Sequence, residues 1–230
     1  MTNQTHNHIV KSFDAELDRL ADEITAMGDA ALTQVEGVLR ALQRRDAALA
    51  QQVIDCDDAI DAREREVGHE ALRLLALRQP TARDLREVLA AIRIAADIER
   101  IADHAVAIAR LVLEIGDADG SIPDELSAMG TLAGAIAREA VLAWQAQDVA
   151  LAQAAWMHDD DLDRCHAQFL TFTVESLRVR PEMAARAMRH QFVAKNFERI
   201  GDHASNIAEN VCFLVEGETA MSMRERCVHR

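Results

Sequence analysis

The sequence is poor in aromatic residues and proline: it has no tyrosine, six phenylalanines, two tryptophans and three prolines in 230 residues. β-Sandwiches and β-barrels depend on β-branched and aromatic side chains, whereas the alanine, leucine, glutamate and arginine that dominate here favour helices. The prolines, at positions 80, 123 and 181, fall between long stretches with helical periodicity. We therefore predict an all-α protein whose helices end near these prolines.

Positive charge and paired cysteines are also scarce. The formal net charge is −14, and such a chain repels phosphate backbones, which argues against nucleic-acid binding. The four cysteines form no Cys-x-x-Cys pair, which is typical of free thiols in a reducing cytoplasm. The N-terminus does not look like a signal peptide, and we see no stretch of roughly 18 apolar residues that would span a membrane. We expect a cytoplasmic protein that reaches a membrane only through its partners.

A duplicated segment decides the predicted architecture. Residues 99–105 read ERIADHA and residues 198–204 read ERIGDHA, with six matches of seven at an offset of 99. Upstream, residues 46–51 resemble residues 148–153 at an offset of 102. Each half then contains three segments with apolar residues at helical spacing. These segments are residues 12–45, 46–78 and 82–115 in the first half, and 124–147, 148–179 and 182–215 in the second.

Long helices with short connections pack as antiparallel bundles. We predict two tandem antiparallel three-helix bundles related by the internal repeat, over residues 12–116 and 123–216. Flexible tails are expected at residues 1–11 and 217–230. Thr81 and Asp84 fit a capping box at the start of the third helix.

Four pairs of carboxylates recur at the same places in the two halves, each pair one helical turn apart. The pairs are Asp57 with Asp61, Glu99 with Asp103, Asp159 with Asp163, and Glu198 with Asp202. Glu99 and Asp103 continue a stripe of apolar positions that begins at Leu85, so we expect this pair to face the core. Like charges one turn apart disfavour a helix, and burial without a partner costs several kcal/mol more. Something positive should compensate them.

Metal binding would provide that compensation. In an antiparallel bundle the second-helix pair can face the third-helix pair, so that four carboxylates converge in each half. Clusters of oxygen ligands without thiolates suit iron, manganese, magnesium or zinc. An acidic pair on a helix is more often solvated surface or half of a salt bridge. The fourfold recurrence leads us to predict metal sites formed by these eight carboxylates.

Two further residue types accompany the acidic pairs. His104 and His203 directly follow the third-helix aspartates, about 100° round the helix, and suit a second layer around the metal. Arg100 and Arg199 follow the glutamates. They could orient the acidic groups or bind phosphate or a partner, but the favoured interpretation is an ion pair that ties the third helix to its neighbours.

The duplicated Glu-Arg-Ile-x-Asp-His-Ala signature, the second-helix aspartates and the six-helix length resemble the PhoU family of phosphate-specific transport system accessory proteins. The resemblance implies two tandem three-helix bundles, a cytoplasmic homodimer, and a divalent or multinuclear metal on the four acidic motifs. Iron is the first expectation for that metal, with zinc, manganese or magnesium as alternatives. Asn196 departs from the repeat, because the first half has Asp97 there, so the two sites could differ in metal load.

The resemblance also implies a function. Such a protein represses the phosphate-starvation regulon by bridging the ATPase subunit of a phosphate ABC transporter and a sensor histidine kinase. No nucleophile–base pair, glycine-rich phosphate loop or cofactor fingerprint occurs, so we predict a binding protein and no enzyme. An alternative is a di-metal oxidase or iron-storage bundle, suggested by Glu66 with His69 and Asp163 with His166, although these pairs are not equivalent under the repeat. A third is a helical scaffold without metal.

Overall fold

The structure is a computed structural model that describes residues 2–78, 80, 82–115 and 121–217, with side chains from Phe13 onward. All regular structure in these residues is helical, which confirms the predicted class. Repeat one comprises α1 (Thr2–Arg44), α2 (Ala47–Asp55), α3 (Asp57–Arg78) and α4 (Ala82–Glu114). Repeat two comprises α5 (Asp124–Ala146), α6 (Val149–Val179), the short 3₁₀ helix η2 (Pro181–Met183) and α7 (Ala184–Glu216).

The turn after the first helix of each repeat is duplicated in detail. Arg45 and Gln147 adopt left-handed conformations with φ of 54° and 48°. The next residues, Asp46 and Asp148, cap the following helices, since Asp46 accepts a hydrogen bond from the Leu49 amide and Asp148 one from the Leu151 amide. Such caps satisfy amide groups that the first turn of a helix leaves without partners. The internal repeat therefore extends to backbone geometry.

Two predicted boundaries are wrong. The single helix predicted over residues 46–78 is interrupted at Cys56, so that Asp57 and Asp58 lie in the first turn of α3, where the helix dipole favours acidic residues. The tail predicted over residues 1–11 is helical from Thr2, because no proline or glycine interrupts the chain before Gly28. Thr81 of the predicted capping box and residues 218–230 of the second tail lie outside the described residues.

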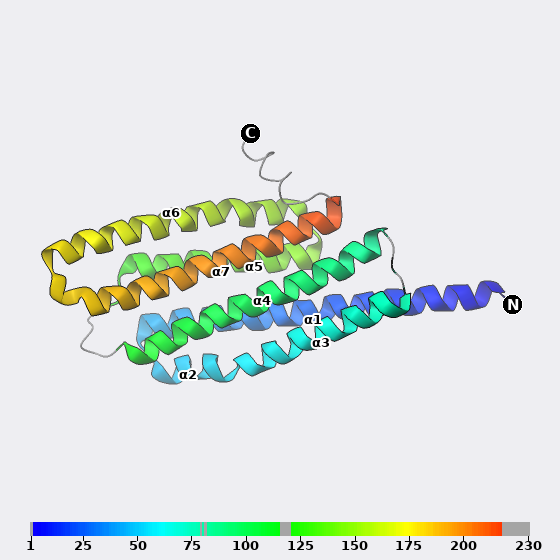
Figure 1. Ribbon diagram of the computed structural model, residues 1–230, viewed down its shortest axis with the longest axis horizontal. Coiled ribbons are helices and arrows are strands. Elements are labelled where there is room, and N and C mark those ends of the chain that lie inside the picture. The colour runs from blue at the N-terminus through cyan, green and yellow to red at the C-terminus, as the bar shows by residue number, and fades with distance from the viewer. Residues whose placement is uncertain (1, 79, 81, 116–120, 218–230) are drawn as a thin grey trace, which may run out of the picture.

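The two repeats cross at symmetry-related glycines. A β-carbon added at Gly28 would lie 2.9 Å from Val141 Cγ1, and one added at Gly130 would lie 2.7 Å from Leu39 Cδ1. Both glycines and both apolar residues correspond at the offset of 102, so α1 and α5 exchange equivalent contacts. α1, α4, α5 and α7 form the centre of the molecule, with α3 and α6 on opposite sides (Figure 1).

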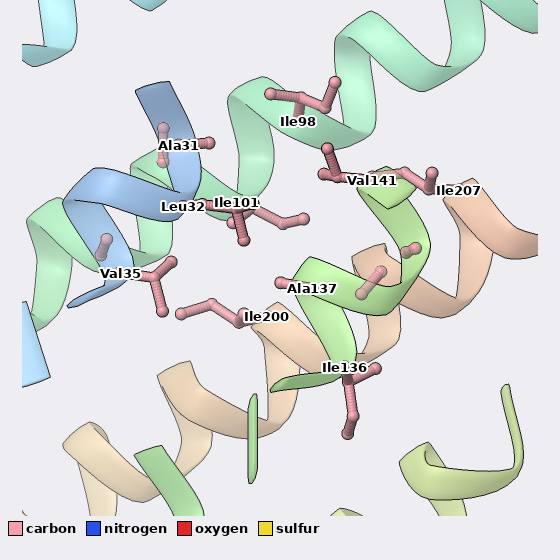
Figure 2. Packing of buried hydrophobic residues seen from close by; sticks show 14 of the residues in the cluster. Ala31, Leu32, Val35, Ile98, Ile101, Ile136, Ala137, Val141, Ile200 and Ile207 are labelled. Carbon is pink, nitrogen blue, oxygen red and sulfur yellow. The ribbon is translucent and has the colours of Figure 1, made fainter. Parts of the chain in front are cut away.

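One hydrophobic core spans both repeats. Figure 2 shows Val35 and Ile101 of repeat one close to Ala137 and Ile200 of repeat two. All four are at most 2% exposed. Burial of each large aliphatic side chain contributes about 1.5–3 kcal/mol, so the repeats stabilise each other. The acidic helices are thus held on a rigid centre.

α5 corrects the expectation that no segment could cross a membrane. Among the described residues, it is the one helix long and apolar enough by length and composition. Half of its most apolar window is buried within the protein, where Leu126, Met129, Ile136 and Trp144 contribute to the core. Its composition follows from its central position, since a helix surrounded by others is apolar on most sides.

Candidate metal centre

The core-facing side of α4 is not the predicted one. Ile98, Ile101 and Ala105 are buried, whereas Leu85 is exposed and Glu99 and Asp103 are partly exposed. The prediction that the acidic pair continues a core stripe is therefore wrong: the pair lies at the edge of the core. A helix packed between several neighbours buries a broad face, and residues at the margin of that face share the same spacing as residues at its centre.

The carboxylates of α6 and α7 meet in repeat two. Asp163, Glu198 and Asp202 each offer an oxygen within 4.8 Å of the others, and the Glu198 side chain is only 12% exposed. In the part of the chain that the structure describes, no other trio of acidic, histidine or cysteine ligands comes this close. Bonds from protein oxygens to divalent metals are about 2.0–2.6 Å long, so oxygens at this separation can share one ion.

Asp159 of α6 is a fourth carboxylate beside this trio, and it packs closely against α7. Its Oδ2 accepts a hydrogen bond from Ser205 Oγ at 2.8 Å, while its buried Oδ1 has no hydrogen-bond partner. A β-carbon at Gly201 would lie 2.5 Å from that Oδ1, so the glycine allows Asp159 to approach α7. Burial is the largest cause that raises the pKa of Asp159 to about 6; the Ser205 hydrogen bond opposes the rise, and the charges of Asp202 and Asp163 add to it.

In repeat one the equivalent carboxylates of α3 and α4 also lie near one another, but no three of these described side chains bring their oxygens as close together as the trio of repeat two does. We call the facing carboxylates of each repeat its acidic groove. Asp57, the counterpart of Asp159, also has a buried Oδ1 without a hydrogen-bond partner. Burial raises its pKa, and the charges of Asp61 and Asp103 add to the effect. Burial likewise raises the pKa of Glu99, with Asp103 and Asp61 contributing. The structure therefore brings each second-helix pair opposite the third-helix pair of its own repeat.

The two signature arginines pair within their own helices. Arg100 Nη1 lies 2.9 Å from Asp103 Oδ2, and Arg199 Nη1 lies 3.1 Å from Asp202 Oδ2. The favoured prediction, an ion pair to a neighbouring helix, is wrong, because a side chain three residues along a helix is the nearer partner. Repeat two adds Lys195, whose Nζ lies 2.5 Å from Glu198 Oε1 and which sequence reasoning did not include. Its counterpart in repeat one is Ala96.

The signature histidines join α4 to α7. Their rings stack with centroids 5.5 Å apart. His104 Nδ1 lies 2.9 Å from Asn196 Oδ1, and His203 Nδ1 lies 2.9 Å from Asp97 Oδ1. Burial lowers the pKa of His104. Neither hydrogen bond involves any of the eight carboxylates, so a second layer of metal contacts at His104 and His203 stays a prediction. The Asp97/Asn196 equivalence was visible in the sequence, but its histidine partners were not.

The residues suggested for a di-metal oxidase are not brought together. Glu66 and His69 line a cavity between α1 and α3. Asp163 and His166 lie on α6, on the opposite side of the molecule (Figure 1). A shared centre built from these two pairs is therefore not formed.

The acidic grooves fit a hard cation. Their donors are carboxylate oxygens, which suit iron, manganese, magnesium and zinc. Three buried carboxylate oxygens in these grooves lack hydrogen-bond partners: Asp57 Oδ1, Asp159 Oδ1 and Glu198 Oε2. Buried polar atoms normally have partners, and a bound ion would supply them. In repeat two, where three carboxylate oxygens converge, the arrangement could hold a metal between α6 and α7.

Together these features define a class: a duplicated helical bundle with one acidic groove in each half. The PhoU domain model matches the chain twice, over residues 24–112 and 126–211. Each match falls within one repeat. The chain belongs to the PhoU family.

Relatives match over almost their whole length. A phosphate-specific transport system accessory protein PhoU homolog of Xylella fastidiosa (strain Temecula1) is 42% identical, over 99% of this chain and 95% of the relative. The homolog of Caulobacter vibrioides (strain NA1000) is 36% identical, over 95% and 96%. The crystal structure of PhoU from Pseudomonas aeruginosa superimposes with a TM-score of 0.87 at 35% identity, over 90% of this chain and all of that one. The phosphate transport system regulatory protein PhoU from Streptococcus pneumoniae gives 0.81 at 25% identity, over 90% and 99%.

Proposed function

We propose that this chain is a metal-binding accessory protein of phosphate-specific transport, which negatively regulates phosphate uptake and the phosphate-starvation regulon. The observation that carries the proposal is the full-length likeness to relatives named as accessory proteins of that transport system. The duplicated acidic grooves support the metal-binding part, since three buried carboxylate oxygens there have no hydrogen-bond partner.

The protein acts by binding and catalyses no reaction. In the proposal it is a cytoplasmic homodimer that links the ATPase subunit of the phosphate ABC transporter to a sensor histidine kinase. When phosphate is plentiful, this link holds the kinase in its repressing state. Relatives named as accessory or regulatory proteins support a role without catalysis.

Deletion of the gene tests the regulatory role. We expect phosphate-responsive genes to be expressed in phosphate-rich medium after deletion, and the wild-type gene to restore repression. Normal repression in the deletion strain would contradict the proposal. Pull-down of the ATPase subunit and of the kinase with the purified protein tests the two links separately.

Metal analysis tests the grooves. We compare the wild type with Glu99→Ala/Asp103→Ala in repeat one and Glu198→Ala/Asp202→Ala in repeat two. Each double variant should lose the metal of its own repeat, because two of the four facing carboxylates are gone. Iron, zinc, manganese and magnesium are titrated into metal-free protein and measured by calorimetry and elemental analysis.

The matched control is Asp29→Ala/Glu125→Ala, which removes the same charge from exposed positions. Its metal content should equal that of the wild type. Unchanged binding after both groove pairs are removed together would show that these carboxylates hold no metal.

A further inference from the structure

The first helices of the two repeats differ in length. α1 runs from Thr2 to Arg44, whereas α5 begins only at Asp124, which corresponds to Asp22 at the offset of 102. Residues 2–21 of α1 therefore have no counterpart in repeat two. Figure 1 shows the consequence: α1 continues along α3 and beyond it, but the α6–α7 hairpin extends past the start of α5.

In repeat one the extra part of α1 covers the far end of α3. Leu17 and Leu20 are only 7% and 3% exposed, and Leu20 lines the same cavity as Val67 of α3. Beside them the Glu16 carboxylate is buried and accepts two hydrogen bonds from Arg78, at 3.0 Å from Nε and 2.8 Å from Nη2. The covering segment is thus an amphipathic helix with two leucines and an adjacent carboxylate.

The equivalent positions in repeat two line an open groove. Val67, Ala71 and Leu74 of α3 are buried, and they correspond to Phe169, Thr173 and Ser176 of α6. Phe169 and Thr173 are buried as well, at 3% and 7% exposed, whereas Ser176 is partly exposed. These three α6 residues form a groove together with residues from the end of α6, η2 and the start of α7. The lining residues used below are Phe172, Arg180 and Arg186. We call this the α6–α7 groove.

The groove has apolar and basic character suited to such a helix. Phe172 is 55% exposed, although its counterpart in repeat one is the charged Glu70. Phe192 of the same hairpin is equally exposed but does not line the groove, and its counterpart is Arg93. Exposed apolar patches of this kind mark interaction sites in soluble proteins.

Charge complements the apolar surface. Arg180 lines the groove and corresponds to Arg78, the residue that holds Glu16 in repeat one. Arg186 lines the groove as well and donates a hydrogen bond to the Ser121 carbonyl. Two arginines beside an apolar groove, in a chain of net charge −14, favour an acidic partner.

We propose that the α6–α7 groove binds an amphipathic helix of a partner protein, which presents two leucine-like side chains one turn apart and a carboxylate to Arg180. The partner helix takes the place that residues 13–21 of α1 take in repeat one. The chain's own segment is already buried on repeat one, with Glu16 bound by Arg78, so a second copy would have to release it. Helix-in-groove recognition of this kind uses apolar anchors at helical spacing.

A peptide with the sequence of residues 11–24 is the probe, because this segment occupies the equivalent site. The peptide carries a side-chain staple, since isolated helices shorter than about 12–15 residues are marginal in water. Its binding to the full-length protein is measured by fluorescence anisotropy in EDTA, so the result does not depend on the proposed metal. We expect binding that weakens at least about tenfold in Phe172→Asp and in Arg180→Glu.

The matched control is Leu72→Asp, which places the same charge on an apolar residue of α3 that is 62% exposed and does not line the groove. It should bind like the wild type. Equal binding by the wild type and all three variants, or no binding by the wild type, would overturn the proposal. A peptide with Glu16→Arg should prefer Arg180→Glu over the wild type, and the absence of this reversal would count against the carboxylate contact.

Sedimentation velocity tests whether the groove binds a separate partner protein or a second copy of this chain. We expect Phe172→Asp to keep the oligomeric state of the wild type. Dissociation of the wild-type oligomer by this variant would show that the groove joins copies of the chain, and the proposal of a separate partner would then be wrong.

Discussion

Repeat one and repeat two place equivalent carboxylates on equivalent helices but surround them differently. Asp159 in repeat two receives a hydrogen bond from Ser205 and packs against Gly201. The corresponding positions beside Asp57 in repeat one are Val106 and Ala102, which have no polar side chain. The duplication thus preserves the positions of the acidic groups along the helices. The neighbouring residues determine the distances between the carboxylates and their pKa values.

The packing around the two glycines where α1 crosses α5 also differs between the repeats. At Gly28 the close neighbour is Val141 alone. At Gly130 an added β-carbon would lie 2.7 Å from both Leu39 Cδ1 and Phe197 Cζ. Phe197 is fully buried and replaces Ile98 of repeat one. Repeat two therefore surrounds its glycine with more side-chain volume than repeat one does.

The largest effect should come from testing this packing difference with Gly130→Ala and Gly28→Ala. Overpacking of a dense core costs about 1–3 kcal/mol, whereas glycine to alanine inside a helix gains up to about 1 kcal/mol. We expect Gly130→Ala to lower the free energy of unfolding by about 2 kcal/mol. Gly28→Ala should cost less, because its added methyl group would meet one residue, Val141, whereas that of Gly130→Ala would meet both Leu39 and Phe197. Urea denaturation of both variants measures the difference. Equal effects would mean that Phe197 does not confine Gly130.

Much of this fold could be predicted because helical periodicity and the duplicated signature are local properties of the chain. Six apolar segments, with a proline at three of their five boundaries, predict six helices, and the offset between the signatures predicts two equivalent halves. The facing of second-helix and third-helix carboxylates also follows, since adjacent antiparallel helices must align their ends. These inferences need no knowledge of which residues meet across the molecule.

The features that sequence reasoning missed depend on contacts between distant segments. The side of α4 that faces the core depends on how α7 packs against it, so Glu99 was assigned to the wrong part of the helix surface. The stacking of His104 on His203 joins residues from different repeats. Burial of Glu16 depends on Arg78, sixty-two positions later in the chain. The first two depend on the packing of the two repeats, and the third depends on the packing of α1 against α3 within repeat one.

An intermediate effect is expected from Asp159→Asn, which neutralises the carboxylate that packs against Gly201. The variant keeps the shape and the hydrogen-bonding capacity toward Ser205 but removes a buried charge next to Asp202 and Asp163. In metal-free protein at pH 8, we expect it to raise the free energy of unfolding by about 1 kcal/mol. The same variant should bind metal more weakly. Greater stability together with weaker metal binding would distinguish a ligand from a structural residue.

The pH dependence of this effect has a defined sign. The pKa of Asp159 is raised from 3.8 to about 6, so the folded protein binds a proton more tightly than the unfolded chain. The contribution of Asp159 to the stability of the metal-free wild type should therefore increase as the pH falls from about 7 towards about 4, and Asp159→Asn should lack this contribution. Asp57→Asn is the matched variant in repeat one, where burial raises the pKa in the same direction. Denaturation at several pH values in EDTA measures both, and identical pH profiles for the wild type and Asp159→Asn would contradict the assignment.

The smallest effect should come from Lys195, which gives repeat two a positive charge that repeat one lacks. Its Nζ lies 2.5 Å from Glu198 Oε1, so it competes with a cation for that carboxylate. A partly exposed pair of this kind contributes about 0.2–1 kcal/mol, which corresponds to a change in affinity of a few-fold. We expect Lys195→Ala to raise the metal affinity of repeat two by this amount, and Ala96→Lys to lower that of repeat one. Calorimetric titration, with the other repeat disabled by its double alanine substitution, measures each site alone. A decrease in affinity after Lys195→Ala would instead mean that the lysine orients Glu198 for the metal, and that the extra charge improves the site of repeat two.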